Sequence, residues 1–279
     1  MINIQSASIL ILGAGNMGAS IASGLLKQQW PAEQIIFCDR RAERHPVLKQ
    51  TYPNCQIVCH PSELETLPKV ILLSVKPFDM PSACEPFRAL SPARDTLYIS
   101  IAAGVPISAF HSWLGNEATI VRCMSNTPAA IGVGMSGLYC AENTPEVDKK
   151  LAETILSSTG KILWVDKETM LDAVTALSGS GPAYFFYLME CLQESGKALG
   201  FNSQDSYILT MQTMLGAARL AAEQKIDFAT LRANVTSKGG TTEQAINCFI
   251  NKDLKNIVDQ AVKAAAHRAS EISQSFTKE

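Results

Sequence analysis

A stretch late in the chain combines residue types that suit the binding of an anion. In NVTSKGGTTEQAI (residues 234–246), two glycines and four hydroxyl residues interrupt an otherwise helix-forming sequence. Gly239 and Gly240 would expose successive main-chain N–H groups, and Thr241 or Thr242 would cap the helix that follows. Such a nest at the start of a helix binds a carboxylate without any arginine. An ordinary capped loop is the alternative that the stretch alone leaves open.

A second group of residues near the N-terminus suits the binding of a dinucleotide. The segment GAGNMG (residues 13–18) follows a short apolar strand at residues 8–12 and opens a helix with apolar periodicity. The first glycine makes a tight turn, the second lets the backbone approach a pyrophosphate, and the third lets the helix pack on the strand. The alternative is a glycine-rich turn in another doubly wound sheet. We expect these residues to bind the cofactor: Gly13, Gly15, Asn16, Met17 and Gly18.

The end of the second predicted strand carries conflicting signals about the cofactor. Asp39 lies about twenty residues past the glycines, where an acid binds the ribose of NAD. Arg40 and Arg41 follow at once, and arginine suits the 2′-phosphate of NADP. A solvated loop is the alternative for both arginines.

Further apolar runs predict a parallel sheet with both faces covered, at residues 55–60, 69–75, 96–104 and 118–124. Ligands bind outside the carboxyl ends of such strands, so the ends of the last three runs are expected to face one cleft. Lys76 could reach a phosphate or ribose, or simply lie at the surface. Asn126 could bond a carboxamide or a turn. The strand-end residues are Ser74, Val75, Lys76 and Pro77, then Ala102, Ala103 and Gly104, whose small size would admit a nicotinamide, and then Asn126.

The second half of the chain reads as helices. We predict a Rossmann-type doubly wound domain at residues 1–165 and an all-helical dimerisation and substrate-binding domain at residues 166–279. Segments such as PAYFFYLMECL are apolar nearly all round, which predicts a helical bundle shared between subunits. The alternative is that the helices cover the nucleotide domain. A glycine–proline group at residues 179–182 predicts a kink or a restart of a helix.

Composition narrows the class of protein. The chain has 279 residues, 47% hydrophobic and only 18% charged, with a net charge of −2. This balance gives no electrostatic case for nucleic acid or for an anionic membrane, and no apolar run approaches the length of a membrane span. The eight scattered cysteines indicate reduced thiols in a cytoplasm. Cys55, Cys59 and His60 lack a second half with ligand spacing, so we expect no metal.

Several motifs in the same order resemble the pyrroline-5-carboxylate reductase family along essentially the whole chain. They are GAGNMG, SVKP, SIAAGV, RCMSNTP, LSGSGPAY and, most specifically, VTSKGGTTEQAI. The resemblance implies reduction of the C=N bond of 1-pyrroline-5-carboxylate to L-proline by NADPH, less often by NADH. It also implies a homodimer formed through the helical domain, with some members assembling five dimers into a decamer. Proline is common in the family where this chain has Ser125 and Lys238, and asparagine where it has Pro61.

The resemblance also assigns roles to residues. Main-chain amides of the glycine–threonine loop would hold the substrate carboxylate, and Thr242 would lie beside the ring nitrogen as the catalytic residue. The cofactor would be lined by residues 73–77, which adds Leu73, together with residues 102–104 and Asn126. The residues implied in substrate binding are Val235, Gly239, Gly240, Thr241 and Thr242.

The chain has four histidines, and none of them lies in the cleft-forming motifs. The reduction of an imine suits such a chain. A cyclic imine arrives protonated near neutral pH, so the enzyme mainly orients hydride donor and acceptor, and a hydroxyl can relay the nitrogen proton. The nearest rival is a β-hydroxyacid dehydrogenase, but GSGPAYFFYLME (residues 179–190) lacks the lysine that such an enzyme needs. A non-catalytic NADP-binding protein is the other alternative.

Overall fold

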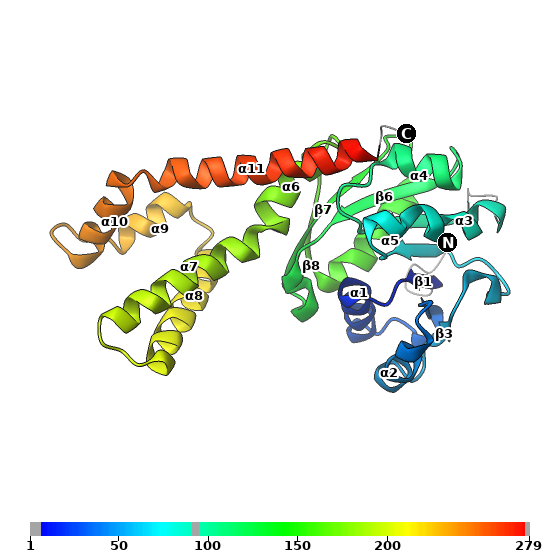
Figure 1. Ribbon diagram of the computed structural model, residues 1–279, viewed down its shortest axis with the longest axis horizontal. Coiled ribbons are helices and arrows are strands. Elements are labelled where there is room, and N and C mark those ends of the chain that lie inside the picture. Colours follow the sequence, from blue (N-terminus) through cyan, green and yellow to red (C-terminus); the bar gives the residue numbers. More distant parts are fainter. Residues whose placement is uncertain (1–6, 91–94, 277–279) are drawn as a thin grey trace. The chain divides into compact units, whose positions relative to one another are not determined.

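The computed structural model describes residues 7–90 and 95–276, and the chain forms two compact units. The sheet unit comprises Met1–Ser180 and Ala265–Glu279, and the helical unit comprises Gly181–Ala264 (Figure 1). This division differs from the expected boundary after residue 165, because residues 166–180 and the end of the last helix pack with the sheet. The expected extent of the functional dimerisation domain, residues 166–279, stays a prediction.

The sheet has eight strands in the order β3-β2-β1-β4-β5-β6-β7-β8, all parallel to their neighbours except at the antiparallel β6–β7 pair. The first six correspond to the strands predicted from the sequence, and β7 and β8 were not predicted. The strands are β1 (Ile9–Leu12), β2 (Ile35–Cys38), β3 (Gln56–Val58), β4 (Val70–Leu73), β5 (Leu97–Ser100), β6 (Thr119–Met124), β7 (Gly134–Cys140) and β8 (Gly160–Trp164).

Two separate hydrophobic cores cover the two faces of this sheet. Strand β1 is buried along its whole length, and its alternate residues contribute to opposite cores. Ile9 and Ile11 pack with the helices α1 (Asn16–Lys27) and α5 (Glu146–Leu156). Leu10 and Leu12 pack with α3 (Met80–Leu90) and α4 (Ile107–Leu114). Strand β1 is therefore buried on both sides, as its continuous apolar run predicted.

Helix α2 (His45–Thr51) follows β2.

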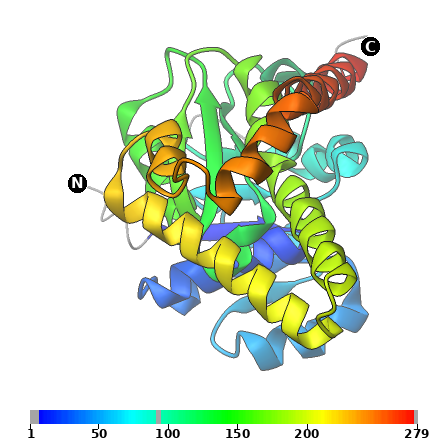
Figure 2. The same ribbon diagram turned by 90° about the vertical axis from the view of Figure 1, so that its left-hand side faces the viewer.

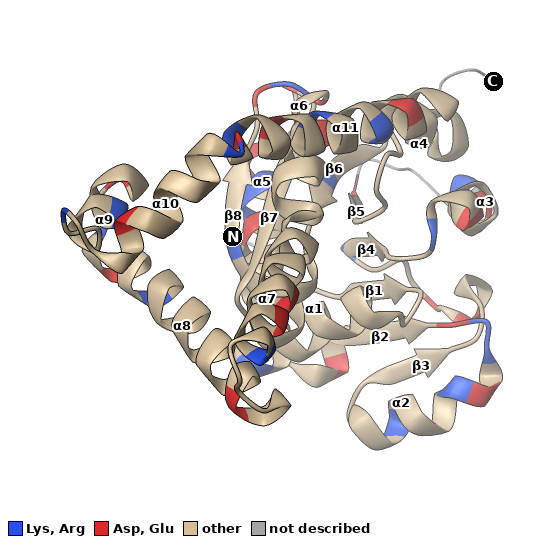
Figure 3. Cartoon of the chain, turned by 60° about the vertical axis from the view of Figure 1, so that its left-hand side comes forward, with Lys and Arg blue, Asp and Glu red and all other residues tan. Residues whose placement is uncertain are grey.

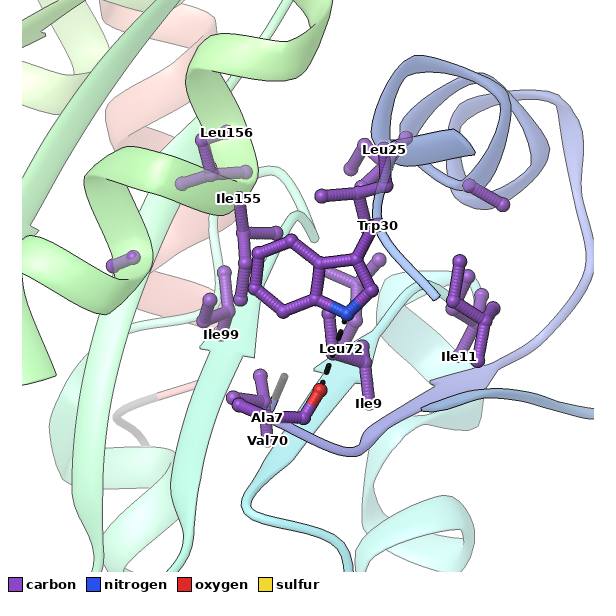
Figure 4. Close-up of a cluster of buried hydrophobic side chains, with 14 of the residues drawn as sticks. Ala7, Ile9, Ile11, Leu25, Trp30, Val70, Leu72, Ile99, Ile155 and Leu156 are labelled. Carbon is purple, nitrogen blue, oxygen red and sulfur yellow. Dashed lines mark hydrogen bonds between the residues drawn. The ribbon is translucent and has the colours of Figure 1, made fainter. Parts of the chain in front are cut away.

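Trp30 anchors the first of these cores. Its ring lies among aliphatic side chains from the strands and from α1 and α5, and its Nε1 donates a hydrogen bond to the carbonyl oxygen of Ala7 at 3.2 Å (Figure 4). The buried indole N–H is thereby satisfied, as large aromatic side chains require in a core. Trp30 therefore ties the segment after α1 to the residue just before β1.

The path from sheet to helical unit contains an irregular turn. Helix α6 (Met170–Val174) runs into a π-helical turn at Thr175–Gly179, and α7 (Gly181–Ala198) begins afresh after it. The N–H of Ser180 bonds the carbonyl of Thr175 at 2.8 Å, which is the i to i−5 spacing. The predicted restart at the glycine–proline group is thus confirmed.

The helical unit has almost no core of its own. It holds α7, α8 (Ser203–Gln224), α9 (Phe228–Asn234), α10 (Thr241–Asn251) and the first part of α11 (Leu254–Ser275). Helices α7 and α8 form an antiparallel hairpin (Figure 2). Across residues 181–264, all of which are described, the buried residues are Gly181 and Ser206 and no buried hydrophobic side chain is found. Figure 3 shows charged residues spaced along these helices, and many large hydrophobic side chains between them are exposed. Such a surface requires a partner chain.

Candidate functional site

The glycine turn after β1 has the geometry that a phosphate-binding turn needs. Gly13 adopts φ +94°, a left-handed conformation suited to glycine, and a Cβ there would lie 2.8 Å from Val75 Cγ1. A Cβ at Gly18 would lie 2.7 Å from Ser74 Oγ. Beside Gly15, by contrast, no described residue outside its immediate chain neighbours and its own helix backbone comes within 4 Å of the position of a Cβ. The first and third glycines are thus enforced by packing, whereas the second leaves open space for a ligand.

Ser74 fixes this turn from the neighbouring strand end. Its hydroxyl donates to the carbonyl oxygens of Gly13, at 2.5 Å, and of Leu12, at 3.0 Å. Helix α1 begins directly after Gly15, without a side-chain cap, so its first N–H groups remain for an anion. The carboxyl ends of β1 and β4 therefore meet at this turn.

A cleft of about 720 Å³ runs along these strand ends. Of the expected cofactor residues it is lined by Gly13, Gly15, Asn16, Asp39, Arg40, Arg41, Ser74, Val75 and Lys76. Residues that were not predicted also line it, namely Leu12, Cys38, Arg44, His60, Pro61, Asp79, Ser82, Ala83 and Pro86. Met17, Gly18, Leu73 and Pro77 lie beside the cleft rather than in its wall. The side chain of Leu73 is fully buried, so only its main chain could serve a ligand.

Asp39 lies in this cleft but is already fully engaged. Its Oδ1 accepts hydrogen bonds from the main-chain N–H of Arg41 at 3.0 Å and from Arg41 Nε at 2.9 Å. Its Oδ2 accepts from Arg41 Nη2 at 2.9 Å and from Arg44 Nη1 at 3.1 Å. Burial alone raises the pKa of Asp39, but the hydrogen bonds and charge of Arg41, and then the charge of Arg44, outweigh burial and hold the pKa below its ordinary value. The carboxylate is therefore ionised and paired with protein groups.

His60 lies outside the cleft-forming motifs, but the structure places it in the wall of the cleft. His60 follows β3 and caps a short 3-10 turn: its Nδ1 accepts from the N–H of Ser62 at 3.3 Å, while Glu63 accepts from the N–H of His60 at 2.7 Å. Because β3 is the edge strand next to β2, this ring belongs to the end of the cleft near Asp39. The sequence signal was its place at a strand end.

The carboxyl end of β5 differs from the expectation of free space. Gly104 has φ +77°, and a Cβ there would lie 2.5 Å from Ile272 Cγ2 on α11. The room that the missing side chain leaves is therefore filled by the chain's own last helix, within the sheet unit. Ala102 is buried and Ala103 half-buried, and neither lines the cleft. Their contact with a nicotinamide stays a prediction.

Asn126 links three segments of the sheet unit by hydrogen bonds of its side chain. Its Nδ2 donates to the carbonyl oxygen of Ser178 at 3.1 Å, and its Oδ1 accepts from the N–H of Met135 at 2.9 Å. The side chain thereby ties the end of β6 to the π-helical turn and to β7. The turn-bonding alternative describes this residue, and its binding of a carboxamide stays a prediction.

The glycine–threonine stretch opens a helix, but not with the expected cap. The N-cap of α10 is Gly240, without a side-chain hydrogen bond, so the prediction that Thr241 or Thr242 caps this helix is wrong. Gly239, at φ +74°, donates its N–H to Glu243 Oε2 at 2.8 Å, and Gly240 donates to Ser237 O at 3.0 Å. The two glycine amides are therefore satisfied within the loop.

The main-chain N–H groups that follow the two glycines are available to a ligand instead. Among the described residues, no acceptor is found for the main-chain N–H groups of Thr241, Thr242 and Glu243, the first turn of α10. Thr242 is half-buried, and its hydroxyl likewise has no hydrogen-bond partner in the described part of the chain. Val235, at the end of α9, is 61% exposed. An anion at the start of α10 would meet free donors and the positive end of the helix dipole.

Comparison with known proteins places these features in a family. The model of the pyrroline-5-carboxylate reductase dimerisation domain matches residues 168–272, and the model of coenzyme F420-dependent NADP oxidoreductases matches residues 8–104. The chain is 41% identical to a pyrroline-5-carboxylate reductase of Pseudomonas aeruginosa, over 97% of this chain and 98% of that protein.

Solved structures agree with the sequence relatives. A pyrroline-5-carboxylate reductase from Coxiella burnetii, 36% identical, superposes with a TM-score of 0.91 over 96% of this chain and 99% of its own. A Plasmodium falciparum pyrroline carboxylate reductase with NADP bound, 26% identical, gives a TM-score of 0.83 over 96% and 99% of the two chains. The predicted Rossmann-type sheet followed by a helical dimerisation region is thereby confirmed.

Proposed function

The chain belongs to the pyrroline-5-carboxylate reductase family, and on this premise we propose how its residues reduce the C=N bond of 1-pyrroline-5-carboxylate to give L-proline. It is an oxidoreductase of proline biosynthesis that uses NADPH. Because the chain belongs to this family, the alternative of a β-hydroxyacid dehydrogenase is excluded. The observation that carries the residue-level proposal is the row of free main-chain N–H groups at Thr241, Thr242 and Glu243, in the stretch that the sequence singled out.

The cofactor fits the cleft of the sheet unit. The open space beside Gly15 admits a pyrophosphate to the start of α1, while Gly13 and Gly18 keep the turn close to Ser74 and Val75. The N–H groups at the start of α1 would bond the phosphates, and Lys76 supplies a further positive charge in the cleft wall. When bound, NADPH supplies the hydride that is transferred to the imine carbon.

The substrate carboxylate is held at the start of α10. Thr241 and Thr242 offer main-chain N–H donors there, and Gly240, at the N-cap, presents no side chain that would shield them. The main-chain N–H of Gly239 could bind the substrate carboxylate only if its hydrogen bond to the carboxylate of Glu243 were broken. Val235 presents an exposed aliphatic side chain suited to the apolar part of the ring. These donors orient a ring whose carboxylate sits next to the reacting bond.

Thr242 is the residue proposed to act on the ring nitrogen. Its hydroxyl has no hydrogen-bond partner in the described part of the chain, so it can bond the nitrogen of the iminium and hold the proton that becomes the N–H of proline. No strong acid is needed, because the imine is basic enough to arrive protonated. The remaining requirement is near-attack geometry, about 3–3.5 Å between the reacting carbons.

The helical region is a dimerisation domain, and homo-oligomers follow from it. We propose a homodimer through α7, α8, α10 and α11, whose large hydrophobic side chains are exposed in the single chain. We further propose assembly of five dimers into a decamer, as in some family members. The compartment we propose is the cytoplasm, since all eight cysteines are free and four of them are buried. No helix in the described part of the chain could span a membrane.

A spectrophotometric assay tests the function. With 1-pyrroline-5-carboxylate and NADPH, or NADH in its place, we expect loss of the reduced nicotinamide absorbance and formation of L-proline. With 1-pyrroline, which lacks the carboxylate, kcat/KM should fall on the order of 100-fold, the contribution of hydrogen bonds to a charged group. Comparable constants for both imines would refute the carboxylate contact, and no oxidation of either cofactor would refute the reaction.

A further inference from the structure

The last turn of α11 makes two contacts that fix it within the sheet unit. Ile272 fills the space where a side chain of Gly104 would lie, just past β5. One residue later, the hydroxyl of Ser273 donates a hydrogen bond to Asp172 Oδ1 on α6, at 3.1 Å. The position of this end of the helix is therefore set by the carboxyl end of β5 and by α6.

A third contact joins this end of the chain to the loop that follows β4. Phe276 comes directly after α11 and packs against the core that contains Leu10 and Leu12. The centroid of its ring lies 5.8 Å from that of Phe78, and the two ring planes are 38° apart. A tilted pair of rings at this distance attracts. Phe78 belongs to a 3-10 turn at Pro77–Asp79, so the aromatic pair links that turn to the end of α11.

The turn that carries Phe78 is part of the wall of the cofactor cleft. Lys76 and Asp79 line the cleft, whereas Phe78 between them does not. The turn has no side-chain cap, and its internal hydrogen bond runs from the N–H of Asp79 to the carbonyl oxygen of Lys76 at 2.9 Å. Phe78 is 84% exposed, and Phe276 is the aromatic partner found for it among the described residues. Because so exposed a ring adds little to the core, its contact mainly orients the turn.

We propose, resting on the function proposed above, that Phe276 and Phe78 are positioning residues for the dinucleotide. The end of α11 holds the turn after β4 through this ring pair, so that Lys76 and Asp79 keep their places in the cleft wall. Neither ring lines the cleft, and both act through the main chain of the turn. Loss of the pair frees the turn and weakens nucleotide binding. The start of α10, which belongs to the helical unit, is not affected.

Direct binding measurements test this role without turnover. The full chain is titrated with NADPH and followed by nucleotide fluorescence. Phe78→Ala should raise the Kd about 2- to 10-fold, the range that one aromatic pair supports, and Phe78→Tyr, which keeps the ring, should bind like the unaltered protein. The exposure of Phe78 spares the fold in both variants. The matched control is Leu163→Ala, at a side chain 53% exposed on the edge strand β8 and outside the cleft wall, which should leave the Kd unchanged.

Three further readouts separate positioning from general damage. Phe276→Ala should raise the same Kd, and the double variant with Phe78→Ala should bind no more weakly than the weaker single variant, because both remove one contact. At saturating NADPH, kcat and the KM for 1-pyrroline-5-carboxylate should stay unchanged in Phe78→Ala. Without any nucleotide, hydrogen exchange at the Asp79 amide should be about 2- to 10-fold faster in both single variants and unchanged in Leu163→Ala.

An unchanged Kd in Phe78→Ala, an equal loss in Phe78→Tyr, or additive effects of the two alanine substitutions would each overturn the positioning role while leaving the reductase function intact. A fall in kcat or a rise in the KM for the imine as large as the rise in the Kd would overturn it as well. If Phe276→Ala fails to fold, the two Phe78 variants decide alone. Failure of the unaltered protein to bind NADPH or NADH would instead refute the function itself.

Discussion

Arg41 holds the carboxylate of Asp39 at both oxygens, with Nε 2.9 Å from Oδ1 and Nη2 2.9 Å from Oδ2. This parallel pair of hydrogen bonds places a buried acid and an exposed guanidinium at the end of β2, in the wall of the cleft. The pair has a consequence for the stability of the fold at acid pH.

Asp39→Asn should make stability less dependent on pH in acid. Because the folded-state pKa of Asp39 lies below its ordinary value of 3.8, the ionised group stabilises the fold above that value, and this contribution is lost as pH falls through the folded-state pKa. We expect the variant to lose about 1–3 kcal/mol near neutral pH, at the lower end because Arg41 is largely in solvent, and the difference to shrink below about pH 4.

Urea unfolding across pH, at one protein concentration, measures this difference. Asp166→Asn, at an exposed carboxyl, is the control and should show little effect near neutral pH. A difference between the original protein and Asp39→Asn that grows as the pH falls would contradict the assignment.

Thr242→Ala should lower kcat and leave the Kd for NADPH unchanged. The hydroxyl is proposed to bond the ring nitrogen, so its loss should cost on the order of 10- to 100-fold in kcat, and Thr242→Ser should restore most of it. Thr154→Ala is the control, since Thr154 is also half-buried and its hydroxyl bonds only Lys150 O of its own helix. An unaltered kcat in Thr242→Ala would remove the residue from the reaction.

Gly104→Ala should be more destabilising than Gly132→Ala. The two glycines have nearly the same φ, +77° and +78°, but a Cβ at Gly104 meets Ile272, whereas nothing lies within 4 Å at Gly132. Backbone strain should cost both variants about 1–2 kcal/mol, and overpacking should add about 1–3 kcal/mol at Gly104.

A double-mutant cycle of Gly104→Ala with Ile272→Ala isolates the overpacking, because the smaller side chain relieves the clash but not the strain. Independent, additive effects of the two substitutions would show that α11 does not pack against this strand end.

Phe186→Asp should weaken self-association. Phe186 is 62% exposed on α7 in the single chain, in a unit without buried hydrophobic side chains. Losing an interfacial aromatic residue costs about 2–4 kcal/mol, which raises the dimer Kd by at least about 30-fold. Light scattering after size-exclusion chromatography measures the change. Val47→Asp, at a side chain 64% exposed on α2, is the matched control. Equal behaviour of both variants would exclude α7 from the interface.

The elements that could be predicted from the sequence are those with strong local signals. Strands β1, β2 and β4 are wholly apolar, and β3, β5 and β6 are mostly so. The glycine turn follows from conformations that only glycine adopts easily. Strands β7 and β8 were missed because GMSGLYC is rich in small residues and GKILW is short and alternates in exposure. Neither pattern stands out from a loop when the sheet beside it is unknown.

The details of the site depended on contacts that no local pattern records. The saturation of Asp39 depends on the side-chain rotamers of Arg41 and Arg44, and the filling of the space at Gly104 depends on a helix at the other end of the chain. Gly240, and not a threonine, is the N-cap of α10 because the helix already begins at Thr241. In each case tertiary packing decided between alternatives that the sequence left open.

A crystal structure with NADP⁺ and L-proline bound tests the central claim most directly, which is that the start of α10 holds the carboxylate of the reacting ring. We expect a carboxylate oxygen of proline within about 3 Å of the main-chain nitrogens of Thr241 and Thr242, with the Thr242 hydroxyl at the ring nitrogen. A proline carboxylate bound away from residues 239–242 would contradict the claim.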